Sequence, residues 1–320
     1  MTEILVSPQL EERRRKLAHV LPLDFPISLN IESTNACNLD CFFCPRKESS
    51  KGVGLMDFAL FSRIVDECAE YGPLKLINLH KDGEPLVHPR ILDMVQYIAD
   101  KKAAERFGFT SNGILLSMEK GQRLLDAGLN KISFSIDAVA EETYRKTKGK
   151  DKYAVVEQNV RDFLSIKPGY VEVAVKFIHM QENLGEKEAF IEKWRGAGVE
   201  IIINEYHDWS GGVRNSSLLS ILPTSEFACE NPFYASAINW NGTVSLCCVD
   251  WNSQAIIGDV HTQSLVEIWR GAQLRRIRDL HLRGKANCVS PCANCTYKKA
   301  ENREHIGGWL MQNREQIMGY

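Results

Sequence analysis

Three cysteines, Cys37, Cys41 and Cys44, lie close together in the spacing C-x3-C-x2-C. Thiolates are the usual protein ligands of iron–sulfur clusters, and three of them can hold three irons of a [4Fe–4S] cubane. The fourth iron then has no protein ligand and is open to a substrate or cofactor, as in catalytic metal sites that keep one position open. A structural zinc site is the alternative, but it would need a fourth Cys or His nearby, and residues 45–50 supply neither.

With Phe43 directly before its last cysteine, this motif resembles the signature of the radical S-adenosylmethionine (SAM) superfamily. The resemblance implies that the open iron binds the amino and carboxylate groups of SAM. It implies that an electron from the reduced cluster cleaves SAM to a 5′-deoxyadenosyl radical, which abstracts a hydrogen atom from an unactivated C–H bond. The electron would come from a donor such as a flavodoxin or ferredoxin.

Two polar turns later in the chain extend the resemblance. Residues 81–85, Lys-Asp-Gly-Glu-Pro, are similar to the family's Gly-Gly-Glu-Pro motif, which binds the SAM amino group, except that Asp82 stands where glycine is usual. Residues 110–113, Thr-Ser-Asn-Gly, are similar to the family's Thr-Asn-Gly turn. The residues expected to bind SAM are Gly83, Glu84, Ser111, Asn112, Ser133, Ser135, Asp137, His179 and Gln181. For His179, the alternative to SAM binding is a structural role at the rim of the expected barrel.

Most of the remaining cysteines gather in the last third of the chain. Their pattern, a first Cys, then Gly-x4-Cys, then Cys-x2-Cys, resembles the Twitch domain, the shortened form of the SPASM iron–sulfur domain. Cys288 is an alternative to Cys292 as a ligand, and a zinc module is the alternative to a cluster, because four thiolates suit either metal. The resemblance implies a second [4Fe–4S] cluster, without an open iron, held by Cys229, Cys247, Cys292 and Cys295.

Cys248 directly follows Cys247 and has no place among these four ligands. A thiol S–H bond is weaker than a carbinol C–H bond, so a thiol can return a hydrogen atom to a carbon radical. Adjacent residues of a strand point to opposite faces, so Cys248 faces the barrel mouth if Cys247 faces the second cluster. We predict Cys248 as a catalytic hydrogen donor, and Asp250 as a group that helps to restore its thiol by proton transfer. The alternative is a buried cysteine without a catalytic role.

Stretches of strand-like and helical composition alternate in the part of the chain that carries the first set of motifs. Strands are expected at 25–31, 74–79, 106–110, 131–136, 171–178 and 201–205, and helices at 56–71, 91–101, 118–127, 154–166 and 187–197. This alternation is typical of a parallel sheet of βα units and predicts an α/β fold, a partial (β/α)6 TIM-like barrel. The chemistry of such barrels lies at the carboxyl ends of the strands, where the cysteine loop and the polar turns fall. Alternation also places Ser133, Ser135 and Asp137 on one face, toward the barrel mouth.

The chain is expected to divide into an N-terminal helical extension (1–24, with a helix over 8–19), a radical SAM core (25–209), a linker (210–228) and a small C-terminal Twitch/SPASM-like domain (229–320). In the last part, Asn241-Gly242 predicts a hairpin between strands at 235–240 and 243–247. A helix over 264–281 and a closing helical stretch over 301–317 are expected to follow.

The composition, 44% hydrophobic and 25% charged residues in a chain of 320, is that of a globular protein. A net charge of −2 argues against nucleic acid as a partner, because phosphate binding needs a basic surface. Neither a signal peptide nor a membrane-length apolar run is seen, so we expect a cytoplasmic protein without a membrane partner. In a reducing compartment, clustered cysteines more often bind metal than form disulfides. Cys68, on an apolar helix face, is expected in the core.

The sequence predicts a radical SAM enzyme and leaves its reaction open. An epimerase acting on a sugar or aminocyclitol, such as an aminoglycoside, is preferred, because only residues 1–24 precede the first strand and no peptide-recognition domain is seen there. A dehydrogenase of the same substrates and an enzyme that matures or epimerises a ribosomal peptide are the alternatives. A non-enzymatic iron–sulfur electron carrier is disfavoured, because it would need none of the SAM-binding motifs.

Overall fold

The computed structural model describes residues 17–210, 212, 228–293, 295–296 and 304–319. The predicted helix over 8–19 and linker over 210–228 lie almost entirely outside the described residues, as does the start of the closing stretch 301–317. Among the helices that the structure describes, none is long and apolar enough to span a bilayer.

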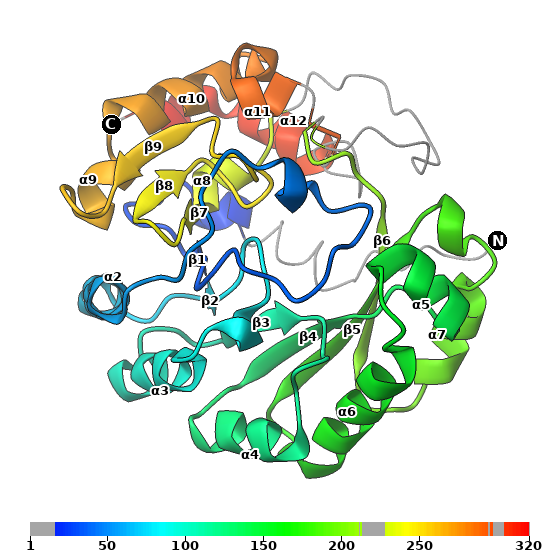
Figure 1. Ribbon diagram of the computed structural model, residues 1–320. Coiled ribbons are helices and arrows are strands. Elements are labelled where there is room, and N and C mark those ends of the chain that lie inside the picture. Colours follow the sequence, from blue (N-terminus) through cyan, green and yellow to red (C-terminus); the bar gives the residue numbers. More distant parts are fainter. Residues whose placement is uncertain (1–16, 211, 213–227, 294, 297–303, 320) are drawn as a thin grey trace.

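Six parallel strands form the main part of one curved sheet, in which neighbours in sequence are also neighbours in space. Figure 1 shows these strands as a crescent with the helices on its outside. The predicted α/β fold and partial barrel are confirmed, and each predicted strand end lies within three residues of the observed one. The strands are β1 (Ser28–Ile31), β2 (Leu76–Asn78), β3 (Phe107–Ser111), β4 (Lys131–Ser135), β5 (Glu172–His179) and β6 (Glu200–Glu205).

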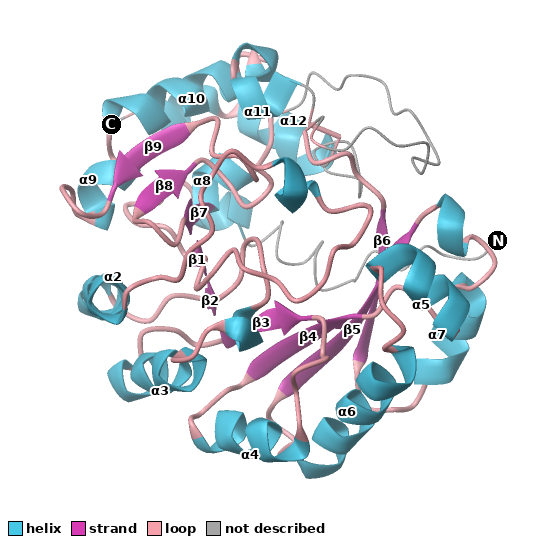
Figure 2. Cartoon of the chain, in the orientation of Figure 1, coloured by secondary structure: helices cyan, strands magenta, loops and turns pink. Residues whose placement is uncertain are grey.

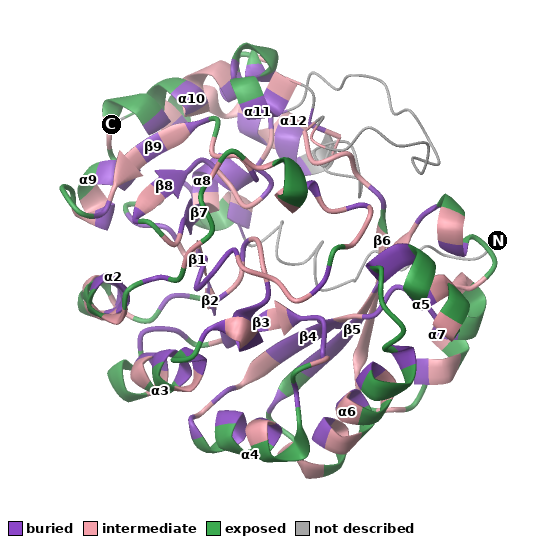
Figure 3. Ribbon diagram, in the orientation of Figure 1, coloured by how far each residue is buried: buried purple, intermediate pink, exposed green. Residues whose placement is uncertain are grey.

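The connecting helices bury one face against the sheet and expose the other, as Figure 3 shows. Cys68, on the inner face of α2, is fully buried in the main core, as predicted. Helix α5 was not predicted, because its buried residues Tyr144, Thr147 and Lys148 form no apolar stripe. The helices are α2 (Phe58–Tyr71), α3 (Ile91–Lys101), α4 (Met118–Asp126), α5 (Glu141–Lys148), α6 (Tyr153–Ile166) and α7 (Lys187–Trp194).

The C-terminal region continues the same sheet beyond β1 (Figure 2). Strand β7 (Ala235–Ile238) pairs in parallel with β1, and β8 (Thr243–Ser245) and β9 (Ile256–Asp259) follow antiparallel. The predicted hairpin is present, and Gly242 at its turn has φ 86°, a left-handed conformation that suits glycine. Because the sheet runs across the predicted boundary at residue 229, the division into domains remains a proposal.

Short helices cover this second part of the sheet. The predicted helix over 264–281 is in fact two helices, because Gly271 is extended (φ −62°, ψ 150°) and caps the second of them. The helices are α8 (Asn231–Tyr234), α9 (Leu265–Trp269), α10 (Ala272–Leu282), α11 (Ser290–Ala293), α12 (Glu304–Gln312) and α13 (Arg314–Met318).

Candidate active site

The carboxyl ends of the barrel strands border a cavity of about 520 Å³. Its wall includes the cysteine loop after β1, with Cys37, Cys41 and Cys44, and the turns that follow β2 and β3. The C-terminal region contributes Cys248 and Val249 to the same cavity. The edge of the sheet where chemistry was predicted thus holds one site built from both parts of the chain.

The cysteine loop runs from β1 to the short 3-10 helix Pro45–Glu48. Arg46 donates to the carbonyl of Leu39 at 3.0 Å, which closes the loop on itself. Burial raises the pKa of Cys41 to about 11 and the pKa of Cys44 to about 12. Iron must therefore displace the thiol protons when it binds, as metals do at cysteine sites.

A buried lysine that the sequence analysis missed lies beside this loop. Lys148, at the end of α5, forms an ion pair with Asp137, and its ammonium group lies 5.1 Å from the centre of the Phe43 ring. Burial lowers the pKa of Lys148, but the Asp137 carboxylate and Cys41 raise it by more, so the pKa is raised overall. The site thus keeps a fixed positive charge next to the cysteine loop.

The turn after β2 requires glycine at position 83. Gly83 has φ 79°, and a Cβ there would lie 2.5 Å from the carbonyl oxygen of Thr34. The next amide, of Glu84, donates to the carbonyl of Ala36 at 2.8 Å. This close approach packs the turn against the chain that leads into the cysteine loop.

Glu84 connects this turn to the loop after β3. Its carboxylate accepts hydrogen bonds from the Ser111 hydroxyl at 2.8 Å, the Asn112 amide at 2.7 Å and the Leu86 amide at 3.1 Å. Burial raises the pKa of Glu84 despite these hydrogen bonds. Two carboxylate oxygens offer about four acceptor positions, so the three donors leave room for one more, from a bound ligand.

Five of the nine predicted SAM-binding residues line the large cavity: Gly83, Glu84, Ser111, Asn112 and Ser135. Ser133, Asp137, His179 and Gln181 do not line it. Asp137 has φ 63° and turns out of the strand, where its carboxylate accepts from Lys148 and from the Ile178 amide at 2.6 Å. His179 lies 3.3 Å from the carboxylate of Glu205, which fits the structural role at the rim.

Further polar side chains that were not predicted as site residues line the cavity from the strands themselves. The side-chain amide of Asn78 donates to the side-chain oxygen of Asn30 at 3.0 Å, and the ammonium group of Lys176 donates to the Thr110 hydroxyl at 3.0 Å. Burial, and then repulsion from Lys131, lowers the pKa of Lys176 to about 8. The sequence held a signal for these residues. Inward-facing positions of a filled barrel are usually apolar, so polar residues at such positions indicate a ligand-binding cavity.

Four of the C-terminal cysteines line a second cavity, of about 20 Å³. Cys288, the alternative ligand, is exposed and does not line it, and the Cys229 amide donates to His281 at 3.2 Å. In the described part of the chain, no three Cys, His, Asp or Glu side chains converge as a single metal ion would need, whereas each cysteine of a cubane binds a different iron. The four cysteines of this cavity are those predicted as ligands: Cys229, Cys247, Cys292 and Cys295.

Cys248 lines the large cavity while its neighbour Cys247 lines the small one. The reason predicted for this difference, alternation of side chains along a strand, was wrong, because β8 ends before these residues and both lie in the following turn. Asp250 does not suit the predicted proton transfer, because it is buried outside the large cavity and its carboxylate accepts from the amides of Gln254 at 2.8 Å and Ala255 at 3.0 Å. Asp250 instead stabilises the turn that presents Cys248.

Two family models match the chain. The model of the Radical SAM superfamily matches residues 31–182, and the model of the SPASM iron-sulfur cluster-binding domain matches residues 229–296. The first range contains the cysteine loop and the Glu84 turn, and the second contains all four cysteines of the small cavity. The chain therefore contains a radical SAM domain followed by a C-terminal SPASM-type iron–sulfur domain.

Curated relatives resemble about half of the chain. A tungsten-containing aldehyde ferredoxin oxidoreductase cofactor-modifying protein of Pyrococcus furiosus is 29% identical over 177 residues, which are 55% of this chain and 44% of the relative. A probable GTP 3′,8-cyclase of Methanocaldococcus jannaschii is 30% identical over 181 residues, 56% of this chain and 58% of the relative. The chain thus spans about half the length of the relatives it matches.

Solved structures resemble the fold over most of the chain. BtrN in complex with AdoMet and 2-DOIA has a TM-score of 0.59 at 20% identity, covering 84% of this chain and 92% of BtrN. Streptococcus suis SuiB bound to precursor peptide SuiA has a TM-score of 0.66 at 13% identity, covering 83% and 70%. AnSMEcpe with bound AdoMet has a TM-score of 0.61 at 13% identity, covering 92% and 96%. At these identities the likeness concerns the fold alone.

The two matched domains imply two [4Fe–4S] clusters and SAM as cofactors. The chain's residues fit these cofactors chemically. Three thiols lie on the wall of a cavity large enough for a nucleoside, beside the buried Glu84 carboxylate, and four thiols surround a separate small cavity.

Proposed function

We propose that this enzyme inverts a carbinol carbon of a sugar or aminocyclitol, with Cys248 as the hydrogen-atom donor. The position of Cys248 carries the proposal: it lines the large cavity with the cysteine loop, while the adjacent Cys247 lines the small cavity. A small-molecule ligand also accords with the fold, since the similar BtrN structure contains 2-DOIA.

The cavity wall favours a substrate with many hydroxyl groups. Asn30, Asn78 and Thr110 offer both donors and acceptors, as hydroxyl groups do. Burial, and then the charge of Lys176, lowers the pKa of His80 to about 4, so this imidazole is neutral at pH 7 and also has one donor and one acceptor nitrogen. Such a wall suits a polyol better than an apolar side chain of a peptide.

The chain's own residues bind the reactants and supply one hydrogen atom. We propose that Cys37, Cys41 and Cys44 hold the catalytic cluster and that Glu84 accepts a hydrogen bond from the ammonium group of SAM. When bound, these cofactors supply a 5′-deoxyadenosyl radical that takes the hydrogen atom from the carbinol carbon.

Cys248 then completes the inversion. Its S–H bond breaks and a new C–H bond forms on the opposite face of the substrate carbon, which leaves a sulfur radical on Cys248. One electron from a ferredoxin- or flavodoxin-type donor and one proton restore the thiol, so the substrate is not oxidised overall. We propose that the protein uses such a donor and acts in the cytoplasm on a soluble substrate.

Product analysis tests the proposal. Anaerobically reconstituted protein is incubated with SAM, dithionite and a panel of aminoglycosides and peptides, in water and in heavy water, and the products are analysed by mass spectrometry. An epimer keeps its mass in water and gains one mass unit in heavy water. A ketone that has lost two mass units, or a modified peptide, would replace the proposed reaction.

Lys176 favours a dehydrogenase as the second candidate, because oxidation of a carbinol must remove the hydroxyl proton. With a pKa lowered to about 8 by burial, the neutral amine of Lys176 becomes more abundant as the pH rises through 8. For a dehydrogenase, we expect single-turnover ketone formation to rise about tenfold per pH unit below pH 8 and to level above it. Lys176→Met should lose this dependence, and Lys193→Met, on the outer helix α7, should keep it. Epimerisation retains the hydroxyl proton, so its rate should not follow the titration of Lys176.

Glu84→Gln removes the buried negative charge at nearly constant size. We expect SAM affinity, measured by equilibrium dialysis on reconstituted protein, to fall about ten- to hundredfold, because a charge-assisted hydrogen bond contributes about 1.5–3 kcal/mol. Iron content should remain the same, because Glu84 is no iron ligand. Glu157→Gln, on the outer helix α6, is the matched control and should bind SAM normally, because Glu157 does not line the cavity. If Glu84→Gln also binds SAM normally, the carboxylate serves only the turn.

A further inference from the structure

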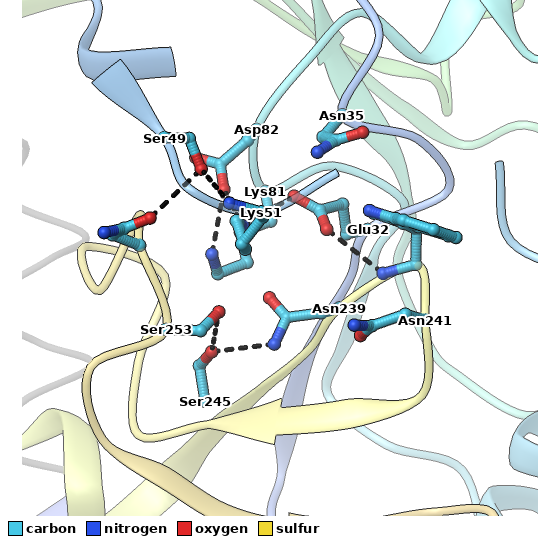
Figure 4. Close-up of polar contacts among 12 residues, drawn as sticks. Glu32, Asn35, Ser49, Lys51, Lys81, Asp82, Asn239, Asn241, Ser245 and Ser253 are labelled. Carbon is cyan, nitrogen blue, oxygen red and sulfur yellow. Dashed lines mark hydrogen bonds and ion pairs between the residues drawn. The ribbon is translucent and has the colours of Figure 1, made fainter. Parts of the chain in front are cut away.

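Asp82, which stands where the family motif has glycine, belongs to a buried group of charges (Figure 4). Its carboxylate accepts from Lys81 at 2.9 Å and from Lys51 at 2.9 Å. Lys51 also lies 3.5 Å from the carboxylate of Glu32. The side chains of Lys81 and Glu32 are fully buried. Two lysines and two carboxyl groups thus lie together directly beside the turn that carries Glu84.

This group of charges is bonded to the C-terminal region at two points. Lys81 donates to the carbonyl of Asp250 at 3.0 Å, and the amide of Trp240 donates to the Glu32 carboxylate at 3.0 Å. Nearby, the Asn252 side chain accepts from the Ser50 amide at 2.9 Å. These partners are about 170 to 210 residues apart in the chain, so each bond joins the barrel to the region that contains the second cysteine cavity.

The bond to Asp250 acts on the turn that presents Cys248. The Asp250 amide donates to the carbonyl of Cys247 at 3.3 Å, and the Asp250 carboxylate accepts from Gln254 and Ala255. Asp250 is therefore held by its carboxylate to residues 254–255, which follow the turn, and by its carbonyl to Lys81 of the barrel. Cys248, two residues before Asp250, lines the large cavity.

Burial is costly for ionised side chains, and burial, followed by repulsion from Asp82, raises the pKa of Glu32 to about 7. Burial lowers the pKa of Lys81, but Asp82 and Glu32 raise it by more. Burial raises the pKa of Asp82, but Lys81 and Lys51 lower it by more. Lys81 and Asp82 thus keep their charges, which makes the contact with Asp250 a strong one.

We infer that Lys81 and Asp82 are positioning residues that fix the turn of residues 247–250 to the SAM-binding turn and so hold Cys248 at the cavity wall. The two residues before Gly83 thereby join the turn that binds SAM to the residue that faces the substrate. The purpose of this link rests on the proposed role of Cys248, but the link itself does not depend on which reaction is catalysed.

The test replaces the pair without leaving a net charge. The double variant Lys81→Met/Asp82→Gly restores the glycine of the family motif and removes one cation and one anion. The control, Lys193→Met/Glu157→Gln, removes an ion pair of 2.6 Å between the outer helices α6 and α7. Each holoprotein, with its iron content verified, is treated anaerobically with iodoacetamide, and alkylation of Cys248 is followed by mass spectrometry. The exposed Cys288 is the internal reference.

Alkylation of Cys248 should become about tenfold faster in the double variant and stay unchanged in the control, because local opening of the turn exposes the thiol. The single variant Lys81→Arg keeps the positive charge, so alkylation of its Cys248 should be as slow as in the parent protein.

Unchanged alkylation of Cys248 in an iron-replete double variant would overturn the inference. If the double variant does not load both clusters, Lys81→Met alone decides the matter by the same comparison. None of these measurements needs the substrate, so a wrong proposal for the reaction would be recognised separately, by its product.

Discussion

Cys248→Ala is expected to cleave SAM and to remove the substrate hydrogen atom, yet to form almost no epimer. The variant lacks the S–H bond that would complete the inversion, while the cysteine loop and the Glu84 turn lie on other parts of the cavity wall. Epimer formation should fall by at least about 100-fold, as expected when a group that takes part in bond formation is removed. Formation of 5′-deoxyadenosine and of epimer, both quantified by mass spectrometry, provide the measurement.

Cys248→Ser sharpens this test, because serine keeps the size and polarity of the side chain but its O–H bond is too strong to donate a hydrogen atom. It should behave like the alanine variant. Cys288→Ala is the control and should form epimer normally, because Cys288 is exposed and lines neither cavity. A normal epimer yield from Cys248→Ala would remove the hydrogen-donor role and shift the preference to the dehydrogenase, with Lys176 as its base.

The barrel could be predicted because its strands and most of its helices carry apolar residues at the period of their own structure. Several helices also end at Gly or Pro, as at Gly72, Gly128 and Pro168. Helix α5 lacks such a stripe, because besides Tyr144 its buried residues are a threonine and the lysine that lies beside the cysteine loop. Strand β9 is four residues long and contains Gly258, so it carries too little pattern to be recognised. The errors thus fall on elements whose shape is set by tertiary contacts.

The cysteines could be found because ligand spacing is a local property of the sequence. Lys148 could not, because whether a charged residue of a helix faces a cavity depends on how that helix packs in the folded protein. Asp250 was misassigned for a similar reason: a strand was assumed where the chain turns, and the turn directs its carboxylate to Gln254 and Ala255.

The largest loss of metal is expected when the three cysteines of the first loop are replaced together. Intact reconstituted protein should contain about eight irons, as two four-iron clusters, and Cys37→Ala/Cys41→Ala/Cys44→Ala should contain about four. The second cluster should remain, because its cysteines line a separate cavity. The triple variant should form no 5′-deoxyadenosine, since the iron that binds SAM is absent. Iron and sulfide assays, with electron paramagnetic resonance of the reduced protein, provide the measurement.

The reciprocal variant replaces the four cysteines of the small cavity, Cys229, Cys247, Cys292 and Cys295, by alanine. It should also contain about four irons but should still bind SAM at the large cavity. The two variants together thus separate the clusters by what each supports, which an iron count alone does not. Cys288→Ala should keep about eight irons; a loss of four there would make Cys288 a ligand despite its exposure. Zinc in the small cavity, or eight irons after the triple replacement, would contradict the assignment of one cluster to each set of cysteines.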